Sequence, residues 1–136
     1  MKTDFPEIIL ASTSPRRGEL LGVLGVRHRV VASDAEESEE DQLTAWEVAP
    51  LNAYRKARAV AKRFPDSIVL GADTVVCLGV RQFGKPRDMA EAEGMLEALQ
   101  GKTHQVVTGV CLVHLRAHNQ RVFVETSWSS RVKART

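Results

Sequence analysis

The sequence is poor in cysteine, in aromatic side chains and in net charge, and each shortage argues against a class of protein. Neither of its two cysteines, Cys77 and Cys111, has a second cysteine or a histidine at zinc-ligand spacing. We therefore expect two reduced, buried thiols and no zinc site. With a net charge of +2 and 5% aromatic residues, the chain has no basic stripe with interleaved aromatics, so we expect no nucleic acid as a partner.

Long hydrophobic runs are absent as well. No segment approaches the length of a membrane-spanning helix, and residues 1–12 hold no apolar stretch long enough for a signal peptide. We therefore expect a cytoplasmic protein without a membrane partner. The 136 residues, 43% hydrophobic and 26% charged, fit one soluble domain that buries most of its apolar surface.

Hydrophobic patterning predicts alternating strands and helices. We expect strands at residues 8–11, 27–32, 67–78, 105–115 and 121–128, and helices at residues 15–24, 50–64 and 89–99. Residues 33–42 form an acidic loop in this interpretation, and the glycines at 79 and 84 bracket a turn or short hairpin. The nearly unbroken apolar run 67–78 is typical of a central strand buried on both faces. This order predicts an α/β fold, with a mixed β-sheet flanked by helices.

Prolines and capping residues predict where the helices begin. Ser14 followed by Pro15 suits an N-cap and a first helical position, and Pro50 is interpreted as the start of the second helix. Asp88 with Glu91 resembles a capping box for the third helix.

Two arginines, Arg16 and Arg17, stand where a helix normally carries acidic residues. The start of a helix is the positive end of its dipole, so two cations there are unfavourable unless an anion lies between them. Free N–H groups at a helix start bind anions, and guanidinium groups bind phosphate oxygens in a bidentate way. The pattern indicates a phosphate site, with two solvated surface arginines as the alternative.

Two further charges interrupt apolar patterns. Asp73 breaks the apolar run of the third strand, where a carboxylate is costly unless it is paired, binds a metal or caps a turn at the strand end. Lys56 lies three residues after Ala53 and four before Val60, and therefore falls on the apolar side of its helix. Its stem either carries the ammonium out to water or places it in a polar pocket at the edge of the core.

Other charged candidates carry weaker signals. Lys85 lies between Gly84 and Pro86, which hold it on a tight turn, and Glu37 belongs to the acidic loop. The run GKT at residues 101–103 resembles the end of a P-loop. It lacks the earlier glycine at the required spacing and follows a helix instead of preceding one, so we reject it.

Together these segments resemble the Maf family. The run LASTSPRRGELL from Leu10 is similar to the family's N-terminal motif nearly letter for letter. LGADTVV from Leu70, followed by GKP from Gly84, resembles its second block, and MLEALQGKTHQVVTGV from Met95 resembles its third. The three blocks come in the family's order and cover most of the chain.

The resemblance implies a Maf- and ITPase-like fold with a nucleotide-binding cleft. It also implies a nucleoside triphosphate pyrophosphatase that yields the monophosphate and pyrophosphate with a divalent metal cation, Mg²⁺ or Mn²⁺. By position, the substrate-binding residues are Ser12, Arg16, Arg17 and Thr74, and the catalytic residues are Asp73, Lys85, Lys56 and Glu37. Asp73 would be the general base or the metal ligand. The helix start at Pro15 would face a cleft shared with Asp73 and Lys85.

The same resemblance bears on specificity and on completeness. Arg16 and Thr74 match the subgroup that hydrolyses dTTP and UTP, with modified nucleotides as further candidates; the subgroup acting on 7-methyl-GTP has Trp and Gln there. Nothing matches the family's C-terminal glycine-rich block, so residues 1–136 are interpreted as a single Maf-like domain that lacks this part. The alternative function is a catalytically impaired nucleotide-binding or scaffolding fragment. Exposed sheet edges would favour association of the chain with itself, for example as a homodimer.

Overall fold

The computed structural model describes residues 6–35, 43–84 and 86–129. The chain forms a single mixed sheet with three helices, in the order β1 (Ile8–Leu10), α1 (Pro15–Val23), β2 (His28–Val30), α2 (Ala45–Ala61), β3 (Ile68–Leu78), β4 (Arg81–Phe83), α3 (Met89–Leu99), β5 (His104–His114) and β6 (Asn119–Ser129). The α/β class with a mixed sheet, expected from the order of apolar segments, is confirmed.

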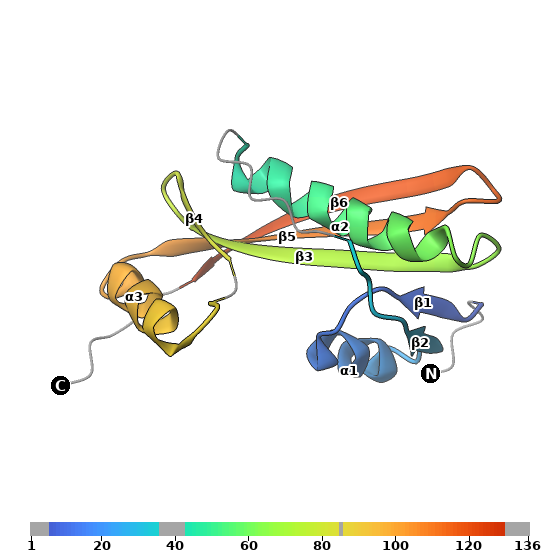
Figure 1. Cartoon of the computed structure of the whole chain (residues 1–136), viewed down its shortest axis with the longest axis horizontal. Helices are drawn as coiled ribbons and strands as arrows, with labels where there is room; N and C mark the ends of the chain where they lie inside the picture. Colours follow the sequence, from blue (N-terminus) through green and yellow to red (C-terminus); the bar gives the residue numbers. More distant parts are fainter. Residues whose placement is uncertain (1–5, 36–42, 85, 130–136) are drawn as a thin grey trace.

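The sheet has the strand order β2-β1-β3-β5-β6, and β4 adds to one end of β3. The first part of β3 pairs in parallel with β1, while β5 and β6 continue the sheet in antiparallel fashion. In Figure 1, α2 lies along one side of the long strands, whereas α1 and α3 lie on the other side. The long strand β3 is therefore the centre of the fold, and the N-terminal unit joins it through β1.

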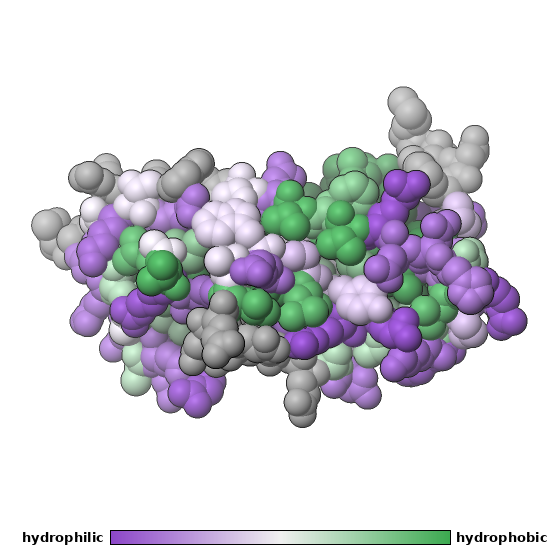
Figure 2. All heavy atoms as spheres, turned by 90° about the horizontal axis from the view of Figure 1, so that it is seen from above, coloured by the Kyte–Doolittle hydropathy of each residue, from purple (hydrophilic) through white to green (hydrophobic). Residues whose placement is uncertain are grey.

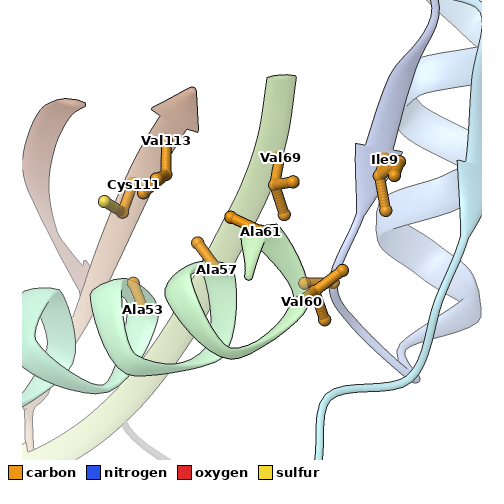
Figure 3. Close-up of a cluster of buried hydrophobic side chains, with 9 residues drawn as sticks. Ile9, Ala53, Ala57, Val60, Ala61, Val69, Cys111 and Val113 are labelled. Carbon is orange, nitrogen blue, oxygen red and sulfur yellow. The ribbon is translucent and has the colours of Figure 1, made fainter. Parts of the chain in front are cut away.

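Helix α2 forms most of the core against one face of β3 and β5. Its small buried side chains meet apolar residues of the strands in one cluster, made of Ile9, Ala11, Ala53, Ala57, Val60, Ala61, Val69, Cys111 and Val113. Figure 3 shows the alanines of α2 turned toward Val69, Cys111 and Val113. A second cluster continues along the N-terminal half of α2 and includes Val48, Val75 and Val107. Burial of this apolar surface is the main term that stabilises the fold.

Two glycines let the backbone of α2 touch the sheet. A Cβ added to Gly71 of β3 would lie 2.2 Å from the carbonyl oxygen of Ala53, and one added to Gly109 of β5 would lie 2.4 Å from the backbone of Ala49 and Pro50. Such distances are far below van der Waals contact, so only glycine fits at either position. The close approach fixes the height of α2 above the sheet, and with it the reach of the polar side chains that α2 carries.

The expectation that β3 is buried on both faces is wrong for the described part of the chain. Side chains alternate along a strand, and the face turned to α2 is buried at Val69, Gly71, Asp73, Val75 and Cys77. On the opposite face most side chains are only partly buried, and that of Thr74 is exposed. The helices on that side cover little, because neither α1 nor α3 has a buried residue.

The second helix begins five residues earlier than expected. Pro50 lies inside α2, and the helix starts at Ala45 after the N-cap Thr44. The carboxylate of Glu47 accepts hydrogen bonds from the backbone N–H and the hydroxyl of Thr44, both at 3.0 Å, and these bonds lower the pKa of Glu47 below its ordinary 4.5. This cap and the packing of Ala45, at the first position of the helix, outweigh the tendency of proline to mark a helix start.

The remaining elements follow the sequence pattern with small shifts at their ends. Pro15 is the first residue of α1, and the positive φ of 75° at Gly25 follows the end of that helix. Asp88 caps α3 by accepting the N–H of Glu91 at 2.8 Å, and β4 forms the expected short hairpin with β3. Among the described residues, no helix combines the length and the apolar character needed to cross a membrane.

Candidate functional site

Arg17, at the start of α1, reaches across the end of β1 to the middle of β3. Its guanidinium donates to the hydroxyl of Ser12 at 3.3 Å, to the carbonyl oxygen of Ala72 at 3.4 Å and to the hydroxyl of Thr74 at 3.1 Å. The fixed fork of the guanidinium suits several acceptors at once. Arg17 therefore joins three segments that the sequence separates by up to 57 positions.

The first turn of α1 carries positive charge at its already positive end. Among the described side chains, none in this turn is acidic, and the side chain of Ser14, the N-cap residue, makes no capping bond. The backbone N–H of Ser14 instead donates to the hydroxyl of Ser12 at 3.1 Å. Arg16 is exposed to solvent, whereas Arg17 is partly buried. The helix start is thus left open to an anion that could meet both its N–H groups and these guanidiniums.

Thr74 connects this group of residues to the next strand. Its hydroxyl lies 3.2 Å from that of Thr108 on β5, directly across in the register of the two strands. Cross-strand threonine pairs of this kind exchange a hydrogen bond. Arg17, Thr74 and Thr108 form one chain of hydrogen bonds on the face of the sheet that lies away from α2.

Asp73 lies on the other face of the same strand, under α2. Its side chain is 11% exposed, and both carboxylate oxygens have partners on the helix. The ammonium of Lys56 is 3.1 Å from Oδ1, and the side-chain amide of Asn52 donates to Oδ2 at 3.3 Å. A buried carboxylate is costly in water-poor surroundings, and the ion pair with a further hydrogen bond compensates for that cost. Of the two interpretations of Lys56, placement in a polar site at the edge of the core is the one observed.

The positions of Gly71 and Gly109 explain why this ion pair forms. Gly109 is the direct register partner of Asp73, and Gly71 lies two residues before it on the same face. Because neither has a side chain, α2 packs directly on the backbone around Asp73. Lys56 and Asn52 are four residues apart on one face of the helix, so both reach the same carboxylate.

The two halves of the candidate site meet at an open stretch of the edge of β3. The parallel pairing with β1 ends at Leu70, and the pairing with β4 begins at Val76, so within the described residues no strand pairs with β3 on this side between them. Arg17 donates hydrogen bonds to Ala72 and Thr74, the two neighbours of Asp73 along the strand, and within the described part of the chain it makes none to the Asp73 carboxylate. The expected cleft shared by the start of α1 and Asp73 is therefore not observed in this form, because Arg17 lies on the face of the sheet opposite Asp73. A ligand that contacted both residues would have to lie across this edge of β3.

Two residues proposed from the sequence, Glu37 and Lys85, lie outside the described residues. Two others were missed. Asn52 has a detectable signal, since it is a polar residue four positions before Lys56 on the same helical face. Thr108 has no sequence signal beyond its place in the third motif, because the pairing of residues between strands cannot be read from the sequence of one strand.

A metal ion would find one acidic group among the residues described at this site. Within the described part of the chain, no three His, Cys, Asp or Glu side chains gather closely enough to hold an ion by themselves. Mg²⁺, however, is usually bound through one or two carboxylates together with substrate phosphates and waters. Asp73 therefore fits a cation that arrives with a phosphate ligand, and does not form a site for a permanently bound ion.

Comparison with known proteins places this geometry in a family. A family model described as Maf-like protein matches residues 7–136, which is nearly the whole chain. The chain belongs to the Maf family. The resemblance seen in its three motifs is thereby confirmed.

Curated relatives of this Maf chain are close to half identical to it over the aligned part. A dTTP/UTP pyrophosphatase of Pelotomaculum thermopropionicum is 46% identical over 85% of the chain and 61% of the relative. Proteins with the same name from Symbiobacterium thermophilum and Deinococcus radiodurans are 47% and 51% identical, over 85% and 79% of the chain and 62% and 55% of the relatives. The chain spans about three fifths of the length of these relatives.

Solved structures support the fold of the Maf chain. The Staphylococcus aureus Ham1 protein matches with a TM-score of 0.63 and 19% identity, over 90% of this chain and 70% of the other. A HAM1 protein from Coxiella burnetii matches with a TM-score of 0.57 and 19% identity, over 91% and 71% of the two chains. At this identity the likeness concerns the fold alone.

Proposed function

We propose that this Maf chain belongs to a nucleoside triphosphate pyrophosphatase that acts on dTTP and UTP. The observation that carries the proposal is the position of the Asp73–Lys56 pair beside a helix start with two arginines, in a chain whose curated relatives bear the name dTTP/UTP pyrophosphatase. In this reaction water adds its oxygen to the α phosphorus, the bond to the oxygen bridging the α and β phosphates breaks, and pyrophosphate leaves with the nucleoside monophosphate.

The triphosphate is proposed to lie along the open edge of β3. The N–H groups at the start of α1 and the guanidiniums of Arg16 and Arg17 would bind its oxygens, and Ser12 would hold Arg17 in place. A triphosphate carries several negative charges, so these cations would also offset the charge that develops on the leaving pyrophosphate. Lys85 and Glu37 belong to the same proposal on sequence grounds alone.

Asp73 is proposed as the general base that takes a proton from the attacking water. A carboxylate has about four acceptor positions, and the bonds to Lys56 and Asn52 occupy one on each oxygen, which leaves room for a water. Lys56 and Asn52 would fix the orientation of the carboxylate, and orientation is a large part of what a catalytic base needs. The proposed divalent cation, Mg²⁺ or Mn²⁺, would supply charge neutralisation when it is bound with the triphosphate.

Thr74 and Arg16 are proposed to contribute to substrate preference. Thr74 is exposed and its hydroxyl accepts a bond from Arg17, and Arg16 is exposed at the helix start. Both residues match the dTTP- and UTP-hydrolysing subgroup of the family. If they set the preference, pyrimidine triphosphates would turn over faster than purine triphosphates. Equal turnover of all triphosphates would contradict their role.

The test is pyrophosphate release from a panel of nucleoside triphosphates with Mg²⁺ or Mn²⁺, comparing Asp73→Asn with the unmodified chain. The variant keeps the shape and part of the hydrogen bonding of Asp73 but cannot accept a proton, so kcat should fall by at least ~100-fold while nucleotide binding changes much less. Asp66→Asn is the matched control, because Asp66 is an exposed aspartate paired with Arg116 away from the site. A chain that binds nucleotide without any turnover would instead be the impaired binding or scaffolding fragment.

A further inference from the structure

On the face of the sheet away from α2, β3 and β5 carry one pair of hydroxyl side chains among apolar neighbours. The register pairs of these two strands on this face are Leu70–Leu112, Ala72–Val110, Thr74–Thr108 and Val76–Val106. Two valines would serve the packing of the sheet as well as two threonines, because valine favours strands and needs no hydrogen-bond partner. The threonine pair is therefore better explained by the site beside it than by the sheet.

The hydroxyl of Thr74 is shared between two partners. A hydroxyl oxygen has one proton and two lone pairs, and a guanidinium can only donate. The bond from Arg17 at 3.1 Å therefore occupies one lone pair of the Thr74 hydroxyl. The hydroxyl of Thr108, 3.2 Å away, takes either the proton or the second lone pair. One of the three positions is left for an atom of a substrate.

Thr108 is the more firmly held member of the pair. Its strand, β5, pairs with β3 on one side and with β6 on the other, whereas between Leu70 and Val76 β3 pairs, among the described residues, with β5 alone. Thr108 is partly buried and Thr74 is exposed. An exposed side chain can turn among its staggered rotamers, and a bond to a fixed neighbour selects one of them. Thr108 therefore sets the direction of the Thr74 hydroxyl.

We propose that Thr108 is a positioning residue that acts through Thr74 on the binding of the substrate, an inference that rests on the proposed function. In the free chain both Arg17 and Thr108 hold the Thr74 hydroxyl. A phosphate that draws the guanidinium of Arg17 away leaves Thr108 to hold it. The contribution of Thr108 is therefore greatest in the complex, where the hydroxyl of Thr74 has to face the nucleotide.

Steady-state kinetics with dTTP give the first test. Thr108→Val keeps the β-branched shape of the side chain and removes its hydroxyl. The KM should rise about threefold to tenfold, the scale of one hydrogen bond between neutral groups. The kcat should stay within about twofold, because Thr108 lies on the face of the sheet opposite Asp73. Thr108→Ser keeps the hydroxyl and should restore the KM to within about twofold of the unmodified chain.

A double-mutant cycle shows whether Thr108 acts through Thr74. Calorimetry measures the Kd of α,β-imido-dUTP, in which nitrogen replaces the bridging oxygen and prevents hydrolysis. Thr108→Val should raise this Kd in the unmodified chain and should raise it no further once Thr74→Val is present. Thr126→Val is the matched control, because it removes a strand hydroxyl that accepts a bond from Trp46 at 2.7 Å on the α2 side of the sheet. The surface on that side, which Figure 2 shows as a mixture of hydrophilic and hydrophobic groups, faces away from α1, so the Kd should not change.

The outcomes separate this role from the activity itself. An unchanged Kd in Thr108→Val, a further rise on top of Thr74→Val, or a chain that does not bind the analogue would overturn the role of Thr108. Binding with the expected coupling but without pyrophosphate release from any triphosphate would support that role and refute the proposed activity. Thr108→Ala removes the same hydroxyl and gives a second measure of the effect if valine disturbs the strand, with urea unfolding as the check that each variant is folded.

Discussion

Replacing Gly71 by alanine tests whether the contact between α2 and the sheet determines both stability and the geometry at Asp73. The added Cβ would lie 2.2 Å from the carbonyl oxygen of Ala53 and 2.9 Å from two atoms of Ala57, where ordinary contact begins near 3.4 Å. All three atoms belong to the helix backbone or to its first side-chain carbon, so no flexible side chain can move aside. The helix itself must lift by about 1 Å.

The cost can be worked from that displacement. Overpacking a core typically costs about 1–3 kcal/mol, and a gap of 0.5–1 Å elsewhere along α2 forfeits roughly a quarter to a half of each dispersion contact it opens. We expect Gly71→Ala to lower the free energy of unfolding by about 3 kcal/mol, a large share of the roughly 5–15 kcal/mol of a small domain. The bond between Lys56 and Asp73 should lengthen as well, with a loss of turnover if Asp73 is the base.

Urea unfolding followed by circular dichroism measures the change, with Gly94→Ala as the control. Gly94 lies inside α3 with no atom within 4 Å of a Cβ, so alanine there should be neutral or stabilise by up to about 1 kcal/mol. If Gly71→Ala loses less than about 1 kcal/mol while the control behaves as expected, α2 is not seated on the strand backbone, and the account of the Asp73 site fails with it.

Three further predictions concern single groups. Bonds from Thr44 lower the pKa of Glu47, so the unmodified chain should be more stable than Glu47→Gln above pH 4.5 and should lose this advantage as the pH falls through the lowered pKa. Thermal unfolding of both proteins across acidic pH measures the difference, and an advantage that persists in strong acid would refute the prediction. Burial raises the pKa of Cys111 to about 11 and raises that of Cys77 too. A disulfide reagent that labels free thiols should therefore react with neither cysteine at pH 8 until urea unfolds the chain. Rapid labelling of the native protein would contradict the burial of both thiols. Lys56→Met leaves the carboxylate of Asp73 without its ammonium and should destabilise by roughly 2–4 kcal/mol, most of which the double variant with Asp73→Asn should recover. A double variant whose loss of stability equals the sum of the two single losses would show that the two residues are not coupled.

Much of the candidate site could be predicted because its residues break local rules. Asp73 inside an apolar strand, Lys56 on the apolar side of a helix and the two arginines at a helix start are each unfavourable where they stand. The structure brings Lys56 and Asp73 together at 3.1 Å, and this pairing offsets the free-energy cost of burying either charge alone. Local rules point to these residues because the free energy of a misplaced charge depends mainly on its immediate surroundings.

Other features depend on contacts between distant segments and could not be predicted. The sequence favours Pro50 as a helix start, because the preference of proline for the first turn is a local rule, whereas the burial of Ala45 against the sheet is not. The apolar run of β3 gives the same pattern whether one face or both are covered, and the coverage depends on where α1 and α3 pack. The contact of Thr74 with Thr108 likewise depends on a register that the turns and the core set together.

The bonds of Arg17 to Ser12, Ala72 and Thr74 make it a tether as well as a potential anion ligand. Helix α1 buries no residue of its own among those described, and β1 is only three residues long, so these bonds supply part of what keeps the N-terminal unit against β3. An anion that claims the guanidinium must compete with them, and each bond to a charged group is worth about 1.5–3 kcal/mol. Binding of an anion here would therefore replace the internal bonds of Arg17 with bonds to the ligand. A triphosphate that spans the helix start and the edge of β3 would then itself connect α1 to β3.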